Sequence, residues 1–115
     1  MLIRIDPSSS MALNEQIAAG IRRSMIAGEV GPGDRLPPAK DLGRSLDVNM
    51  HTVLKAYGRL RDDGLVEMRR GRGVTVMDQP VARASLVEAA RSLVEQATHA
   101  GYQPGEILEL VEVQL

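Results

Sequence analysis

The sequence predicts a mostly helical α+β fold, and two observations carry this prediction. Apolar side chains recur every three or four residues in five separate stretches, which is the spacing of amphipathic helices. Between the third and the fourth stretch, two short apolar runs flank a glycine-rich turn, which is the pattern of a β-hairpin. A chain of 115 residues has the size of one domain, or of a small domain with an appendage.

The composition limits the chemistry and the location of the protein. There is no cysteine, phenylalanine or tryptophan, so disulfides and thiolate metal sites are excluded and the core must be largely aliphatic. No apolar run approaches the roughly 18 residues of a membrane helix. The N-terminus lacks the basic and apolar regions of a signal peptide. We therefore expect a cytoplasmic protein with no membrane partner.

The first predicted helix follows the segment "DPSSS", in which Ser9 or Ser10 can provide the N-cap. Before it, "LIRI" at 2–5 is compatible with a short strand. The helix itself is predicted from an apolar stripe at spacing four: Leu13, Ile17, Ile21 and Met25. We expect Arg22 and Arg23, which lie within this helix, to be solvated.

The middle of the chain predicts two helices joined by a tight turn. Pro38 suits the first turn of a short helix at about 39–46, where its missing N–H is not needed. Asp47 tolerates a left-handed backbone in the turn, and Asn49 is a good N-cap for a longer helix at about 50–62. The longer helix has one apolar face, expected to be core: Val53, Ala56, Tyr57 and Leu60.

A hairpin is predicted next, after Gly64 ends the longer helix. The runs "LVEM" at 65–68 and "VTVM" at 74–77 are predicted to be its strands. The turn between them, "RRGRG" at 69–73, contains three arginines and two glycines. A turn of this kind can be a merely solvated tip or a finger that touches an anion, and the turn alone does not decide between them.

The C-terminal part begins after "DQP" at 78–80, which predicts a domain 1–79 and a region 80–115. A helix at roughly 83–99 and a shorter one after "GYQPG" have more apolar surface than two isolated helices can cover. We therefore expect a homodimer built by this region. The predicted dimerisation residues form its uncovered apolar face: Leu86, Leu93, Val94, Ile107, Leu108 and Val111.

A short helix, a tight turn and a longer helix form a helix-turn-helix pattern, and the hairpin makes it a winged one. In that geometry the N-terminal end of the second helix meets base edges in the major groove of DNA. The residues there can donate, accept or touch a thymine methyl group: Asn49, Met50, His51 and Thr52. Lys55 and Arg59, one and two turns later, are expected to reach phosphates.

The charge distribution agrees with double-stranded DNA as the partner. The net charge is −1, but residues 55–72 carry six basic and three acidic side chains. A local positive patch attracts a polyanion whatever the net charge of the chain. One hairpin after a helix-turn-helix, the arginine turn is predicted to be a wing tip that contacts DNA through Arg70, Gly71 and Arg72.

About residues 12–77, from "LNEQI" through "PGDRLP" and "VNMHTVLKAY" to "RRGRG", resemble the winged helix-turn-helix of the GntR family of bacterial transcription regulators. "VNMHTVLKAY" and the short two-helix C-terminal region resemble its YtrA-like subfamily. The resemblance implies a DNA-binding homodimer, usually a repressor. It also implies DNA contacts by Asn49, His51, Thr52, Arg70 and Gly71.

The same resemblance adds Lys40, which stands where the family usually has a DNA-contacting arginine. Lysine keeps the charge and loses the bidentate geometry. Pro38 replaces a usual serine, and Met50 stands where many members have arginine, so the contacts of those two family residues are absent.

The predicted function is a homodimeric repressor that binds an inverted-repeat operator. Two alternatives remain open: a small-molecule sensor that uses the dimer interface, and the DNA-binding fragment of a larger regulator. No nucleophile–base pair stands out, and His51 and His99 lack metal-ligand spacing, so we expect no enzyme, no cofactor and no metal. A small-molecule effector is possible as a partner, but the sequence names neither effector nor operator.

Overall fold

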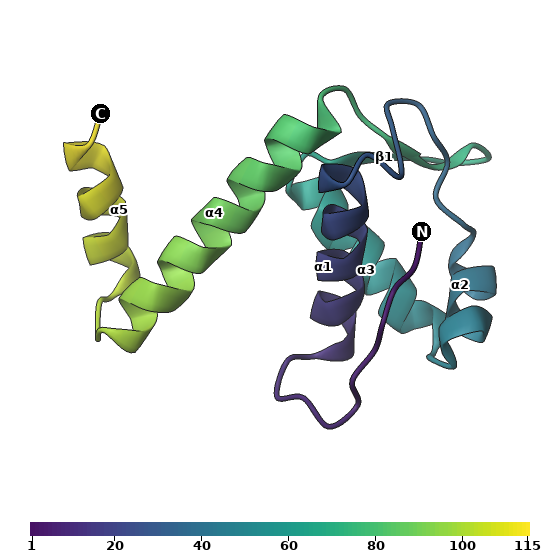
Figure 1. Cartoon of the computed structure of the whole chain (residues 1–115), viewed down its shortest axis with the longest axis horizontal. Coiled ribbons are helices and arrows are strands. Elements are labelled where there is room, and N and C mark those ends of the chain that lie inside the picture. Colours follow the sequence, from purple (N-terminus) through teal and green to yellow (C-terminus); the bar gives the residue numbers. More distant parts are fainter. The chain divides into compact units, whose positions relative to one another are not determined.

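The computed structural model describes all 115 residues and contains five helices and one two-stranded antiparallel sheet (Figure 1). The predicted α+β fold is confirmed. The elements are α1 (Leu13–Ile26), α2 (Ala39–Leu46), α3 (Met50–Asp62), β1 (Val66–Arg69), β2 (Gly73–Val76), α4 (Pro80–His99) and α5 (Pro104–Val113).

The chain forms two compact units, Met1–Ser85 and Leu86–Leu115. The functional division at residue 80 stays a prediction. None of the helices combines the length and the apolar character needed to cross a membrane.

The core of the first unit lies where α1, α2 and α3 pack together. Ile17, Ile21 and Met25 of the predicted stripe on α1 are fully buried. The predicted apolar face of α3 is also confirmed, because all its members are buried: Val53, Ala56, Tyr57 and Leu60. Removal of this aliphatic surface from water is the main stabilising contribution to the unit.

The N-terminal segment is not a strand, contrary to the expectation for residues 2–5. Ile3 packs on α1 at Gly20, where an added Cβ would lie 3.0 Å from the Ile3 side chain. Gln16 takes the place of a strand partner. Its side chain accepts a hydrogen bond from the Asp6 N–H at 2.7 Å and donates to the Asp6 carbonyl at 2.9 Å. The backbone of the segment is therefore satisfied by a buried side chain of α1.

The predicted serine N-cap of α1 is wrong. The N-cap residue is Ala12, which makes no side-chain capping bond. The Ser9 hydroxyl instead accepts a hydrogen bond from the Met11 N–H at 3.1 Å. Serine commonly satisfies nearby backbone groups in this way, and this local bond removes the hydroxyl from capping.

The turn between α2 and α3 has the predicted geometry. Asp47 adopts the left-handed conformation with φ of 55°, and the Asn49 side chain accepts a hydrogen bond from the His51 N–H at 2.8 Å. Gly43 of α2 makes the tight turn possible, because a Cβ there would lie 2.9 Å from the Val48 carbonyl oxygen. Pro38 precedes the first turn of α2 as its N-cap residue.

The end of α3 leads directly into the hairpin. Gly64 has φ of 77°, and the Leu65 N–H donates to the Leu60 carbonyl at 2.9 Å. This is the bond that closes a Schellman motif. The strands pair with Val66 opposite Val76 and Arg69 opposite Gly73, so β1 begins one residue later than predicted and β2 begins and ends one residue earlier.

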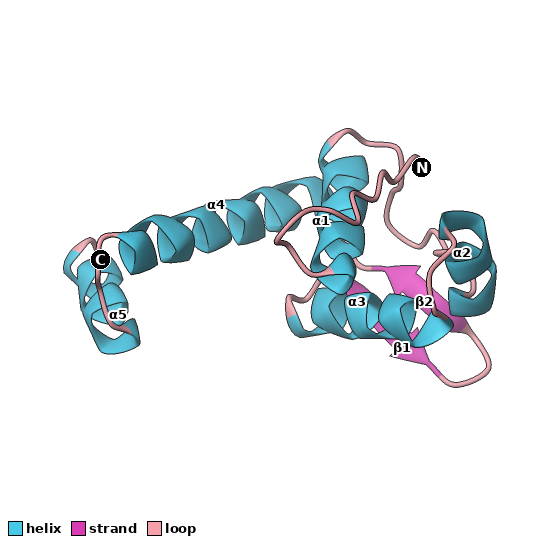
Figure 2. Ribbon diagram, turned by 90° about the horizontal axis from the view of Figure 1, so that it is seen from below, coloured by secondary structure: helices cyan, strands magenta, loops and turns pink.

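The connector before α2 joins the hairpin, which the sequence did not predict. The Leu36 N–H donates to the Val74 carbonyl at 2.9 Å, and Arg35 forms an isolated antiparallel bridge with Thr75. The outer edge of β2 is therefore partly covered (Figure 2). This contact holds the hairpin against the rest of the unit.

α4 begins at Pro80, about three residues earlier than predicted, after Gln79 with φ of 54°. Its first turns belong to the first unit, in which Ala84 is fully buried. In the second unit, Gln103 and Glu106 form a capping box at the start of α5, with the Gln103 N–H donating to the Glu106 carboxylate at 2.9 Å. Such a box satisfies amide groups that the helix itself cannot.

Candidate nucleic-acid interface

The N-terminal end of α3 presents the residues expected to read bases. Met50 is 40% exposed, His51 is also exposed, and Thr52 is half-buried. Asn49 uses its side-chain oxygen for capping, which leaves the amide nitrogen as its group for donation. The four residues therefore form one short stretch that offers donors, acceptors and an apolar side chain.

Basic side chains continue along the same helix and on α2. Lys40 on α2 and Lys55 on α3 are exposed. Arg59 Nη1 lies 3.2 Å from Glu15 Oε1 of α1, and the Arg59 side chain is 45% exposed. An exposed pair of this kind is worth roughly 0–1 kcal/mol, so a phosphate can compete with Glu15 for the guanidinium.

The wing tip carries two arginines without an acidic partner. Arg69 has an acidic partner within the hairpin, because its Nε lies 2.6 Å from Glu67 Oε1. Arg70 and Arg72 are exposed and make no ion pair with the chain. Gly71 between them has φ of 78°, which is the conformation that a type II turn requires at its third position. The tip therefore projects two cations from a turn that depends on glycine.

The hairpin tip and the start of α3 lie on the same side of the unit. Both views place the tip at the end that carries α2 and the start of α3 (Figures 1 and 2). The structure thus brings together, on one side, α2, the start of α3 and the hairpin tip, which carry the residues predicted to contact DNA.

Tyr57 supports this arrangement from the inside, as expected of a core residue. Its hydroxyl donates to the Pro37 carbonyl at 2.6 Å, and its side chain is almost fully buried. Burial raises the pKa of the Tyr57 hydroxyl well above its ordinary value of 10.0. The bond holds the segment just before α2 against α3.

Arg22 is not solvated, contrary to the expectation from the sequence. It is 2% exposed, and its Nη1 lies 4.0 Å from Asp63 Oδ2. The helical period contained the signal, because Arg22 follows Ala18 by four residues and precedes Met25 by three, on the apolar face. Arg22 therefore belongs to the packing of the unit.

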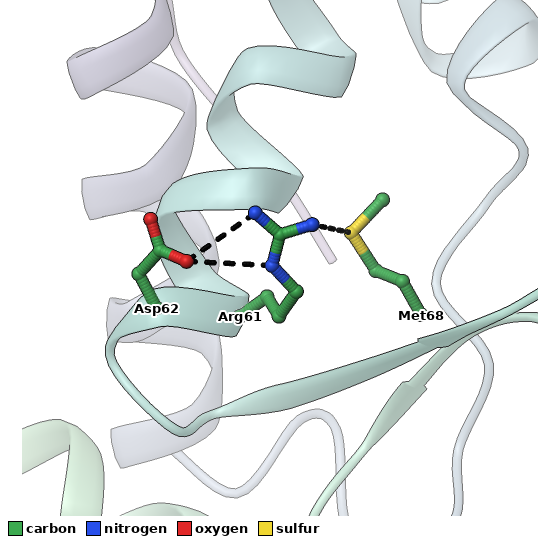
Figure 3. Close-up of polar contacts among 3 residues, drawn as sticks. All are labelled: Arg61, Asp62 and Met68. Atoms are coloured by element: carbon green, nitrogen blue, oxygen red, sulfur yellow. Dashed lines mark hydrogen bonds and ion pairs between the residues drawn. The ribbon is translucent and has the colours of Figure 1, made fainter.

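Arg61 was not singled out from the sequence, and it lies on the exposed side of α3. Its Nε and Nη2 are each 3.3 Å from Asp62 Oδ1, and its Nη1 is 3.9 Å from Met68 Sδ of β1 (Figure 3). The guanidinium thus spans from α3 to the hairpin. Its sequence signal was the basic run along α3, of which it is the last member.

The predicted dimerisation residues differ in exposure. Leu86 is 66% exposed and Leu108 is 70% exposed, and Val94 and Val111 are exposed as well. Leu93 is half-buried. The prediction is wrong for Ile107, which is not part of the uncovered apolar face, since it is only 8% exposed in the single chain. Its side chain is already covered by its own chain.

Residues 13–76 match the family model described as "Bacterial regulatory proteins, gntR family". The chain is 35% identical over 95 residues to the HTH-type transcriptional repressor YtrA of Bacillus subtilis, covering 83% of this chain and 72% of that protein. It is 29% identical over 106 residues to the HTH-type transcriptional regulator YhcF of the same organism, covering 88% of each. Among solved structures, YtrA of Sulfolobus acidocaldarius, a GntR-family transcription factor, superposes with a TM-score of 0.65 at 35% identity. That superposition covers 82% of this chain and 99% of the other.

Proposed function

The chain belongs to the GntR family of bacterial regulatory proteins and is a DNA-binding transcription regulator, and from that premise we propose that it is a homodimeric repressor that binds an inverted-repeat operator. The repressor assignment rests on its likeness to the YtrA repressor. A repressor of this kind acts by occupying DNA, so its activity depends on the affinity and sequence preference of the interface.

One observation carries the proposal. The exposed start of α3 and the two unpaired arginines of the wing tip lie on the same side of the first unit. Helix residues at base edges specify sequence, whereas cations on phosphates position the protein and supply affinity. This division assigns His51 and Thr52 to specificity, and Arg70 and Arg72 to affinity.

The exposed apolar side chains of the second unit support the homodimer. Leu86 and Leu108 are two-thirds or more exposed, and apolar surface of this kind is favourable to bury against a second copy. Two identical recognition helices then read two identical half-sites. Their centres are expected about 34–36 Å apart, or a multiple of that spacing.

Selection of bound sequences from a pool of random duplexes, at a fixed and stated salt concentration, tests the proposal. We expect enrichment of an inverted repeat with half-sites one or more helical turns apart. An asymmetric selected site, or a single half-site bound at full affinity by monomer, would contradict the dimeric arrangement. A pool that shows no enrichment would contradict sequence-specific binding itself.

A further inference from the structure

The middle of α3 contains a glycine that the fold does not need. Glycine is a poor residue for a helix interior, and Gly58 has no left-handed backbone that would require it. A Cβ built there would meet only Arg61 Nη2, at an ordinary contact distance of 3.8 Å. Gly43 differs, because a Cβ there would press on backbone at 2.9 Å. Neither packing nor backbone conformation accounts for Gly58.

Gly58 instead lines a solvent-open hollow of about 440 Å³. Three elements line it: α1, α3 and β1. Its lining consists of Asn14, Leu54, Lys55, Gly58, Arg59, Arg61, Asp62 and Met68. The hollow is therefore bordered by three cationic side chains and one carboxylate, all from α3.

We propose that this hollow receives a phosphate group of the DNA backbone, with Gly58 permitting its approach and Arg61 as a further contact residue. The inference rests on the proposed function and adds a site to it. Glycine allows a close approach that any side chain would prevent. Lysine and arginine are the side chains that neutralise backbone phosphates.

The position of the hollow along α3 fits this occupant. Gly58 lies seven residues after His51, which corresponds to about 10 Å along the helix axis. The major groove is about 12 Å wide. A helix whose first residues touch base edges therefore brings Gly58 close to the wall of the groove, where the phosphates lie.

The cations around the hollow are held only weakly. Arg59 pairs with Glu15 and Arg61 with Asp62, through side chains that are 45% and 55% exposed on the arginine side. Exposed ion pairs contribute little to stability. The Met68 sulfur opposite Arg61 is a weak hydrogen-bond acceptor (Figure 3). Lys55 has no acidic partner. A phosphate can replace the carboxylates without breaking a buried interaction.

The test fills the hollow with a neutral side chain. Gly58→Gln improves helix propensity, so its melting temperature should equal or exceed that of the parent protein. Its affinity for random-sequence duplex should fall about tenfold, and the slope of log affinity against log salt should become shallower by about 0.9. Gly105→Gln is the matched control, since Gly105 also lies in a helix, with open space around it, and it should bind duplex normally.

Arg61 gives a second, independent arm. Arg61→Gln should reduce the salt slope by about the same 0.9, whereas Arg61→Lys should retain it because the charge is kept. Wild-type affinity and slope in Gly58→Gln would overturn the proposal. So would weaker binding with an unchanged slope, because the side chain would then obstruct DNA without displacing a phosphate. If the parent protein bound no duplex at any salt concentration, the proposed function itself would fail, and this site with it.

Discussion

The guanidinium of Arg22 in α1 lies 4.0 Å from the carboxylate of Asp63, the C-cap residue of α3. The backbone of Asp63 is also engaged, since its carbonyl accepts a hydrogen bond from Arg83 Nε of α4 at 2.8 Å. One residue therefore connects α1, the end of α3 and the first turns of α4 within the first unit. Because the start of α3 carries the residues proposed to read bases, this connection holds the helix at its opposite end.

Removal of the Asp63 carboxylate should be destabilising. Arg22 is 2% exposed and faces Asp63 at 4.0 Å, beyond hydrogen-bond distance, so the pair interacts by charge alone. We expect Asp63→Ala to lower the free energy of unfolding in urea by about 1–3 kcal/mol. Glu67→Ala removes the exposed partner of Arg69 and should cost less than about 1 kcal/mol. Equal losses in the two variants would show that the Arg22–Asp63 pair has no special role.

Gly43 should not tolerate even a methyl group. A Cβ there would lie 2.9 Å from the Val48 carbonyl oxygen and 3.3 Å from Met50 Cα, so the turn before α3 would have to shift. Overpacking of this kind typically costs about 1–3 kcal/mol, and Gly43→Ala should lower the melting temperature accordingly. Gly105→Ala, at an open position, serves as the control. An unchanged melting temperature in Gly43→Ala would mean that the turn adapts freely.

Tyr57 should make the protein sensitive to alkaline pH. Burial raises the pKa of the Tyr57 hydroxyl above the ordinary 10.0. The stability that the buried neutral phenol contributes is therefore fully present below pH 10.0 and is lost as pH rises through the folded-state pKa. The buried state favours the neutral phenol, whereas the unfolded chain ionises freely. The Tyr57→Phe variant should lose about 1 kcal/mol at neutral pH, because the bond to Pro37 is absent.

The comparison for Tyr57 is the difference in unfolding free energy between the parent and Tyr57→Phe as a function of pH. Lysine titration affects both proteins equally, so the difference isolates the phenol. We expect the gap to narrow above pH 10.0. A constant gap over the alkaline range would contradict the burial argument.

Substitutions in the hairpin tip and at the start of α3 should change DNA binding in different ways. Arg70→Ala combined with Arg72→Ala should weaken binding to operator and to random DNA by similar factors. The salt slope should become shallower by about 0.9 for each phosphate that the variant no longer neutralises. His51→Ala or Thr52→Ala should cost about 1–3 kcal/mol on the operator and leave non-specific binding nearly unchanged.

Stability must be checked beside binding in these variants. Arg70 and Arg72 are exposed, so the melting temperature should not change, whereas Gly71 is left intact because its φ of 78° disfavours a side chain. Wing variants that relax sequence preference at an unchanged salt slope would show that the arginines read bases or groove width.

Substitutions in the second unit should distinguish loss of the dimer from loss of helical structure. Leu108 is 70% exposed and Ile107 is 8% exposed in the single chain. Leu108→Asp should therefore dissociate the dimer by burying an unpaired charge, with helix content retained. Leu93→Asp should act in the same direction. Ile107→Asp should instead reduce the helix content, since it places a charge inside its own chain. Sedimentation and circular dichroism distinguish the two, and dimeric Leu108→Asp would mean that the interface lies elsewhere.

Features that depend on a few neighbouring residues could be predicted from the sequence. The bounds of α3 at Met50–Asp62, the cap by Asn49 and the left-handed Asp47 all follow from helical period, capping chemistry and turn preference. The helix-turn-helix and its wing follow from the order of these local elements. The exposure of Met50 and His51 is a consequence, since they lie off the apolar face of α3.

Only the tertiary structure decided which distant groups become partners. The backbone of the N-terminal segment could pair with a strand or with a side chain, and the buried Gln16 took that role. Arg22 is hydrophilic by type but lies on the packed face of α1, so it is buried beside Asp63. In the sequence, Gly58 is only a residue of low helix propensity within a predicted helix. The packing of α1, α3 and β1 around it makes a hollow. Burial and partnership depend on the three-dimensional neighbours of a residue, and local sequence patterns do not specify those neighbours.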